Sequence, residues 1–127
     1  MSDAIILVVD DNPVNLKLVR VLLKSDGYDV RTAVDAEEAL ELIASASPRL
    51  ILMDLQLPGM DGLELTRRLK ADPATRGIII VAMTAYAMKG DEQKALDAGC
   101  DGYIAKPIDT RALPGVLEGY LDRGPGQ

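Results

Sequence analysis

Side chains that could take part in chemistry follow the apolar runs of this sequence. In chain order they are Asp10, Asp11, Asp54, Thr84 and Lys106. The 127 residues include no histidine, which excludes Ser–His and Cys–His nucleophiles, histidine-ligated zinc and a phosphohistidine on this chain. Any chemistry must therefore use carboxylates, hydroxyls and lysines.

Three carboxylates in one crevice would need a compensating cation. At spacings of about 4 Å each pair of carboxylates repels by several kcal/mol, at an effective dielectric constant of about 20. Oxygen-only ligands favour Mg²⁺, which needs only one or two carboxylates from the protein. Asp54 is ionised at neutral pH and can act as a nucleophile without a base. Lys106 can neutralise charge on a transferred phosphoryl group, and the Thr84 hydroxyl can donate a hydrogen bond to it.

Each of these residues also has an ordinary structural interpretation. An Asp pair before a helix commonly caps it and compensates its dipole. Thr84 could be an N-cap or turn hydroxyl, and Lys106 a solvated surface lysine. Their joint placement at successive strand ends is the specific signal for a shared site.

Five short apolar runs must position these residues. They are Ile5–Val9, Asp29–Ala33, Leu50–Met53, Ile78–Ala82 and Gly102–Ala105. Helical patterns alternate with these runs, which predicts a parallel sheet covered by helices on both faces. In such a sheet the site lies at the carboxyl ends of the strands.

Several helix boundaries carry recognisable chemistry. Asn12 before Pro13 predicts an N-cap, and the pairs Asp35/Glu38 and Asp61/Glu64 predict capping boxes. Helix ends are predicted at Ser47-Pro48 and Asp72-Pro73, and left-handed residues at Gly27 and Gly99. In the last helix, Pro114, Gly115 and Gly119 predict a kink, a late start or loose packing.

Composition limits the domain organisation and the partners. The length suits one domain, which we expect over residues 1–123 with a frayed tail at 124–127. The chain has no membrane-length apolar run and no basic signal-peptide start, so we expect a cytoplasmic protein. The single Cys100 excludes an internal disulfide. The net charge of −6 argues against binding nucleic acid.

The ordered motifs of the chain resemble response-regulator receiver domains. They are Val9-Asp10-Asp11-Asn12, Asp54-Leu55-Gln56-Leu57-Pro58-Gly59-Met60-Asp61-Gly62, Met83-Thr84-Ala85 and Tyr103-x-x-Lys106-Pro107. The resemblance implies an α/β fold, a doubly wound flavodoxin-like sandwich with five parallel strands in the order 2-1-3-4-5. It also implies a bacterial two-component phosphorelay in which a histidine kinase or a histidine phosphotransfer protein phosphorylates Asp54.

The resemblance also implies a role for each site residue. Asp10, Asp11, Asp54 and the backbone carbonyl of Gln56 would hold Mg²⁺. Thr84, Ala85 and Lys106 would bind the phosphoryl group, Thr84 and Tyr103 would form a switch pair, and Lys106-Pro107 would be a cis peptide. Pro13, Val14, Leu18 and Pro107 would dock the kinase. Beyond self-phosphotransfer and slow autodephosphorylation, no enzymatic activity is expected.

Within the family, the loops are most similar to those of DivK-type single-domain regulators of cell division and cell fate. They are Gly59-Met60-Asp61-Gly62, Ala85-Tyr86-Ala87-Met88-Lys89-Gly90 and Lys106-Pro107-Ile108. A receiver excised from a hybrid kinase remains an alternative. A Mg²⁺-dependent aspartyl phosphatase would need an acid where Gln56 stands, and an FMN binder would need a Ser/Thr/Gly-rich phosphate loop after the first strand. We expect the chain to be a monomer or a weak homodimer and to act by binding a downstream protein.

The first helix has two apolar stripes on nearly opposite sides. Leu16, Val19 and Leu23 form one stripe, and Val14, Leu18, Val21 and Leu22 form the other. One stripe can cover the sheet. The other could bind a helical bundle of a kinase or pack against the last helix of the domain, and the sequence leaves both alternatives open.

Overall fold

The computed structural model of the protein describes residues 5–55, 62–84, 91–105 and 111–123, except for the side chains of residues 91, 92 and 123. Strands and helices alternate along the chain. The strands are β1 (Ile5–Val9), β2 (Asp29–Ala33), β3 (Leu50–Asp54), β4 (Ile79–Thr84) and β5 (Gly102–Ala105). The helices are α1 (Pro13–Ser25), α2 (Ala36–Ala46), α3 (Gly62–Ala71), α4 (Asp91–Ala98) and α5 (Leu113–Arg123).

The strands form one parallel sheet in the order β2-β1-β3-β4-β5, as predicted. Two strand boundaries differ from the predicted ones because pairing continues further along the sheet. Asp54 pairs with Met83, and Thr84 pairs with Ala105. Asp54 and Thr84 are therefore the last residues of their strands. Ile78 lies before β4 and donates its N–H to the Thr75 carbonyl across a turn.

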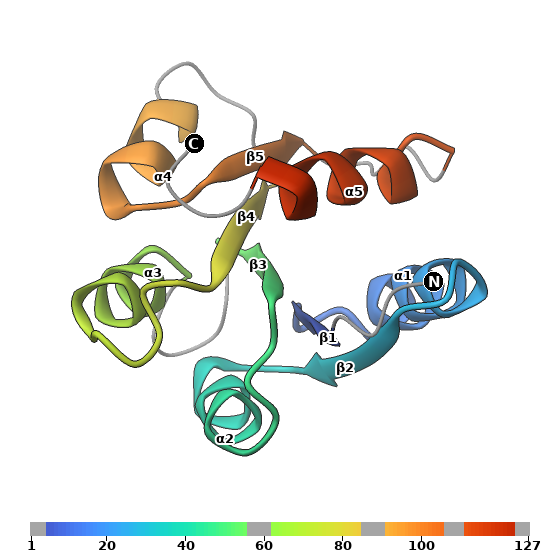
Figure 1. The fold of residues 1–127 in the computed structure, drawn as a ribbon, viewed down its shortest axis with the longest axis horizontal. Helices are drawn as coiled ribbons and strands as arrows, with labels where there is room; N and C mark the ends of the chain where they lie inside the picture. The colour runs from blue at the N-terminus through green and yellow to red at the C-terminus, as the bar shows by residue number, and fades with distance from the viewer. Residues whose placement is uncertain (1–4, 56–61, 85–90, 106–110, 124–127) are drawn as a thin grey trace.

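Helices cover both faces of the sheet. Figure 1 shows α1 and α5 on one side of the strands and α2, α3 and α4 on the other. Each face has its own apolar core. On β3, for example, Ile51 belongs to the core beneath α2 and α3, whereas its neighbour Leu52 belongs to the core beneath α1 and α5. This arrangement explains why the strands are almost continuously apolar.

The predicted N-caps of α1 and α2 are confirmed. The Asn12 side chain accepts hydrogen bonds from the backbone N–H groups of Val14 and Asn15. The Asp35 side chain accepts one from the Glu38 N–H at 2.8 Å. The Glu38 carboxylate in turn accepts from the Val34 N–H rather than from that of Asp35. The Glu38 half of the predicted capping box therefore reaches one residue further back than expected. The second predicted capping box begins at Asp61, which lies outside the described residues.

The ends of the helices follow their predicted chemistry. Gly27 and Gly99 have φ of +94° and +109°, and Ser47 after α2 adopts a left-handed conformation with φ of 49°. Helix α3 stops at Ala71, before Asp72-Pro73.

Helix α5 shows the late start, which was one of the three alternatives predicted for the last helix. It begins at Leu113, so Pro114 lies in the first turn, where backbone N–H groups have no intrahelical acceptor. None of the helices in the described ranges combines the length and the apolar content that a bilayer span requires.

Candidate functional site

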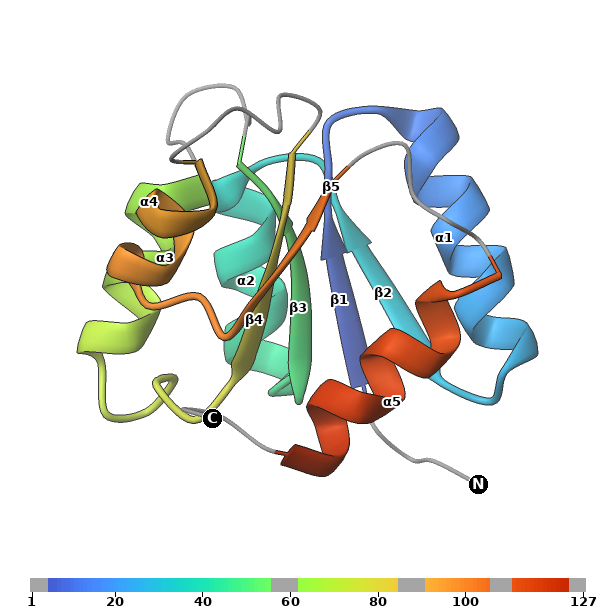
Figure 2. The ribbon, with the colours of Figure 1, turned by 90° about the horizontal axis from the view of Figure 1, so that it is seen from above.

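Of the predicted site residues that the structure describes, Asp10, Asp11, Asp54 and Thr84 lie at the carboxyl edge of the sheet. The strands point toward this edge in Figure 2. Asp10 directly follows β1, and its backbone N–H donates to the Ala33 carbonyl, which extends the pairing with β2. Asp54 ends β3 and Thr84 ends β4. The side chains of these three polar residues are nearly inaccessible to solvent, whereas Asp11 is exposed. The topology therefore brings residues from three separate strands to one edge.

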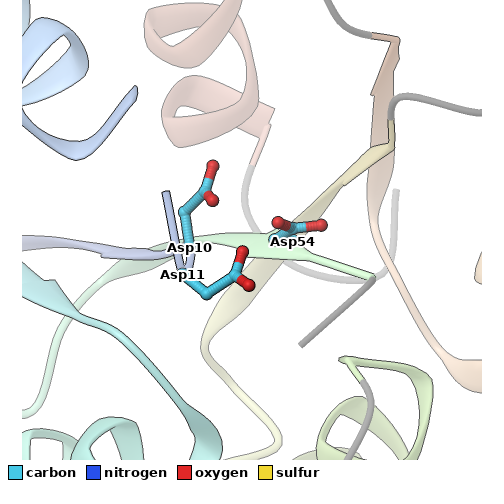
Figure 3. A group of neighbouring side chains, drawn as sticks. All are labelled: Asp10, Asp11 and Asp54. Atoms are coloured by element: carbon cyan, nitrogen blue, oxygen red, sulfur yellow. The ribbon is translucent and has the colours of Figure 1, made fainter. Parts of the chain in front are cut away.

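The carboxylates of Asp10, Asp11 and Asp54 form a cluster whose ligand oxygens all lie within 4.8 Å of one another. Figure 3 shows the three side chains projecting from the ends of β1 and β3 into the same space. Asp10 and Asp54 are only 1% and 2% exposed. Buried carboxylates at this spacing repel one another unless a cation offsets their charge. The cluster offers only oxygen ligands, and Asp11 exposes it to solvent. Both features fit Mg²⁺, which prefers oxygen ligands and keeps several bound waters.

The first turn of α1 holds the Asp10 carboxylate on both of its oxygens. The Asn12 backbone N–H donates to Oδ1 at 2.9 Å, and the Asn15 side-chain amide donates to Oδ2 at 3.4 Å. Asn12 at the same time caps α1 with its side chain. From the sequence, Asn12 was recognisable only as a cap, and Asn15 was missed. Its spacing of five residues from Asp10 carries no signal until the helix is placed beside the strand end.

Gly62, the first residue of α3, is a second positioning residue that sequence reasoning missed. A Cβ atom there would overlap the Asp54 carbonyl oxygen and lie 2.9 Å from the Leu55 Cα. The Gly62 N–H also donates to the Leu55 carbonyl. The missing side chain therefore lets α3 begin directly against the backbone that carries Asp54. The sequence motif Met60-Asp61-Gly62 contains this glycine, but the sequence did not predict its close approach to the backbone of Asp54 and Leu55.

Thr84 and Tyr103 lie on neighbouring strands and on one face of the sheet. Tyr103 pairs in register with Ala82, two residues before Thr84, so the side chains at all three positions point to the same face. Thr84 is buried, and Tyr103 is half-buried against the core beneath α2, α3 and α4. This placement is compatible with the predicted switch pair, whose movement stays a prediction.

Four of the predicted site residues lie outside the described residues. They are Gln56, Ala85, Lys106 and Pro107. The predictions that depend on them are the carbonyl ligand to Mg²⁺, two of the phosphoryl contacts, the cis peptide and one part of the kinase-docking surface.

The two stripes of α1 have different surroundings. Leu16, Val19 and Leu23 are buried, as predicted for the sheet-facing stripe. In the other stripe Leu22 is half-buried against the core shared with α5. Three members remain exposed, and they are Val14 (72%), Leu18 (47%) and Val21 (60%). Packing within the described part of the domain thus accounts for Leu22 but not for the rest of the stripe.

Comparison with known protein families matches residues 6–118 to the response regulator receiver domain. Among curated proteins, the chain is similar to the polar-differentiation response regulator DivK of Brucella anthropi. The two are 43% identical over 116 residues, which cover 91% of this chain and 94% of that protein. DivK of Brucella abortus shows the same identity and coverage.

Solved structures show the same likeness. A CheY-like response regulator receiver domain protein from Methanospirillum hungatei aligns with a TM-score of 0.88 and 34% identity, covering 96% of each chain. The receiver domain of the sensor histidine kinase PA1611 from Pseudomonas aeruginosa aligns with a TM-score of 0.86 and 36% identity, covering 95% of this chain and 99% of that one. The latter structure has a magnesium ion coordinated in its active-site cleft.

Proposed function

Because the chain belongs to the response regulator receiver family, we propose that it accepts a phosphoryl group on Asp54 from a histidine kinase or a histidine phosphotransfer protein. The observation that carries this proposal is the placement of Asp54, which is buried at the end of β3 beside Asp10 and Asp11. A buried carboxylate beside two others, at the carboxyl edge of a parallel sheet, suits a metal-assisted phosphoacceptor better than a structural role.

Asp10, Asp11, Asp54 and the backbone carbonyl of Gln56 are the residues we propose to hold Mg²⁺. When bound, the ion offsets the negative charge that the carboxylates and the incoming phosphoryl group bring together. The Asp54 carboxylate forms the new P–O bond while the P–N bond of the donor phosphohistidine breaks, and the imidazole keeps that electron pair. Thr84, Ala85 and Lys106 would hold the phosphoryl oxygens.

Phosphorylation would then bias a two-state element at this edge of the sheet. The phosphoryl group adds about −1.5 to −2 charges and several strong hydrogen-bond acceptors. If the Thr84 hydroxyl turns toward the new group, it leaves space on the face that it shares with Tyr103. The two positions are diagonal neighbours on paired strands, which supports a coupled movement of both side chains.

We further propose a cytoplasmic, single-domain regulator that acts through a downstream protein target, as a monomer or weak homodimer. The DivK relatives support the single-domain part of this proposal, since the chain covers 94% of the Brucella anthropi protein. That relative is named a polar-differentiation response regulator, and the proposed role of this chain in the cell cycle follows from the likeness to it. A second candidate is a receiver that belongs to a hybrid histidine kinase. The 36% identity to the receiver of a sensor histidine kinase supports it. In both cases the domain turns over no external substrate.

The test of the proposed function is labelling with acetyl phosphate, with and without Mg²⁺, followed by intact mass spectrometry. We expect one phosphoryl group on the wild type, only with Mg²⁺, and none on Asp54→Asn. Labelling of Asp54→Asn, or labelling that ignores Mg²⁺, would count against Asp54 as the acceptor. Catalytic release of phosphate from a phosphomonoester would instead favour the phosphatase alternative.

Docking of the donor on α1 is the second part of this proposal, with Pro13, Val14, Leu18 and Pro107 as contacts. Val14 and Leu18 are exposed, and α1 begins two residues after Asp11. Placing a negative charge at both positions, as in Val14→Glu with Leu18→Glu, should slow transfer from the kinase at least tenfold. Labelling by acetyl phosphate should not change, and equal slowing of both reactions would contradict docking on this face.

A further inference from the structure

Helix α1 carries a charge opposite to that of the protein. The chain has a formal charge of −6, yet α1 contains Lys17, Arg20 and Lys24 and no acidic residue. All three side chains are exposed. The other helices carry at least one acidic side chain each. A local surface of positive potential on an acidic protein attracts acidic partners and orients their approach.

Among the described residues, the cations of α1 have no carboxylate of their own, in contrast to those of α3. In α3, Arg67 and Arg68 pair with Glu64 at 3.8 and 3.2 Å, and Lys70 pairs with Asp101 at 2.8 Å. Within the part of the chain that the structure describes, no carboxylate lies within ion-pair distance of Lys17, Arg20 or Lys24. The hydrogen bond from Arg31 is the main cause that lowers the pKa of Asp29, and Lys24 makes only a lesser contribution. Asp29 forms its ion pair with Arg31. The positive charge of α1 is therefore available to another molecule.

These cations lie alongside the exposed apolar stripe. Val14, Leu18 and Val21 recur at spacings of four and three residues, which places them on one side of the helix. Lys17, Arg20 and Lys24 recur at spacings of three and four, on an adjoining side. The opposite side of α1 is buried on the sheet. α1 thus presents an apolar ridge flanked by a basic ridge, running away from the carboxylate cluster.

We infer that this face of α1 selects a partner helix that carries Asp or Glu side chains beside an apolar stripe of its own. The inference rests on the proposed function, because it names the chemistry of the donor that docks beside Asp54. The apolar ridge supplies affinity, and the basic ridge supplies the rate of encounter and the choice among donors. A second copy of the chain would place like charges opposite each other. An anionic membrane would repel the rest of this acidic protein.

The experiment compares two double variants that change the net charge equally. Lys17→Glu with Arg20→Glu reverses two charges of the basic ridge and leaves Lys24 at the end of the helix. The control, Arg76→Glu with Lys94→Glu, reverses two exposed charges outside α1. Each protein receives phosphoryl groups from a panel of purified histidine kinases and phosphotransfer proteins whose docking helices range from acidic to basic. Transfer is timed at low and high salt, and binding of the unphosphorylated donors is measured in parallel.

We expect donors with acidic docking helices to be the fastest for the wild type. The Lys17→Glu, Arg20→Glu variant should slow them at least tenfold at low salt, shift the preference toward basic donors, and lose most of the salt dependence. The control variant should change the rates by less than threefold. Equal effects of the two variants, or an unchanged ranking of donors, would overturn the inference.

Two further measurements separate other outcomes. Acetyl phosphate should label every variant equally. If it fails to label the wild type, the proposal that Asp54 accepts a phosphoryl group is refuted. Binding of the unphosphorylated donors would still test the α1 surface in that case. Vesicles of phosphatidylglycerol should not bind the wild type. Vesicle binding that depends on Lys17 and Arg20 would assign the face to lipid and overturn the choice of a protein helix.

Discussion

At the scale of single residues, the Asp10 carboxylate links the proposed metal site to α1. Its two oxygens accept hydrogen bonds from the Asn12 backbone and the Asn15 amide, and both donors belong to the beginning of that helix. A ligand carboxylate held in this way keeps its orientation without having to reorganise when a cation binds. Asn15 is therefore a positioning residue, since it would act on the cation only through Asp10.

Replacing Asn15 by alanine tests this role. The variant removes one donor to Asp10, and we expect the Kd for Mg²⁺ to rise roughly threefold to tenfold, the equivalent of about 1 kcal/mol. The measurement is calorimetric titration of Mg²⁺ into the unphosphorylated protein, with Lys17→Ala as a control on the same helix. An unchanged Mg²⁺ affinity, in a variant that unfolds at the same temperature as the wild type, would show that the contact is incidental.

At the scale of elements, the site depends on how closely α3 approaches β3. Two features hold α3 at its ends. The missing side chain of Gly62 allows contact with the backbone of Asp54 and Leu55. At the other end, the Lys70 ammonium binds Asp101 and the carbonyls of Arg76 and Ile78. This ion pair is largely buried, so it ties α3 to the beginning of β5 and to the segment before β4.

A Gly62→Ala substitution should displace the beginning of α3, because the new Cβ would meet backbone atoms that cannot rotate away. We expect a loss of about 1–3 kcal/mol in the free energy of unfolding, as for other overpacked sites. Mg²⁺-dependent labelling of Asp54 should slow as well. Urea titration and acetyl phosphate labelling measure the two effects.

Gly115→Ala is the matched control, because Gly115 also lies in the first turn of a helix and a Cβ added there would meet no atom within 4 Å. It should be neutral or stabilising by up to about 1 kcal/mol. A Gly62→Ala variant as stable as this control would show that the close approach of α3 is not required.

At the scale of the whole molecule, the sheet separates two apolar cores, and the buried Cys100 reports on the unfolding of one of them. Its thiol lies in the core beneath α2, α3 and α4, next to the Thr66 hydroxyl. Burial raises the pKa of Cys100 to about 11. Burial also raises the pKa of Tyr28 in the other core, with a further contribution from Asp26. Unfolding returns both groups to water.

Stability should consequently fall in alkaline solution. A free thiol has a pKa of roughly 8.5, so above that pH the unfolded chain releases the Cys100 proton while the folded protein retains it. Because the pKa of Cys100 is raised in the folded protein, the protonated thiol makes its full contribution to the free energy of unfolding below about pH 8.5. That contribution is lost as the pH rises toward 11. We expect the unfolding midpoint in urea to drop over this window. Cys100→Ala should show a shallower drop, and identical pH profiles for the two proteins would contradict the assignment.

The residues at the strand ends could be predicted from the sequence because they depend on topology alone. Continuous apolar runs separated by helical patterns imply parallel strands, and parallel strands bring their carboxyl ends to one edge whatever the side-chain packing. Asp10, Asp11, Asp54 and Thr84 therefore lie where the motifs placed them. The caps at Asn12 and Asp35 were predictable for a similar reason, since a cap is a contact between residues two or three apart.

Contacts between distant elements were decided only by the tertiary structure. Periodicity showed two apolar stripes on α1, but only the placement of α5 showed that Leu22 is partly covered and that Val14, Leu18 and Val21 are exposed. The amide of Asn15 reaches Asp10, and Gly62 meets the backbone of Asp54, because helices pack at particular distances from the sheet. Those distances depend on the volumes of all the side chains between them, which no local pattern in the sequence records.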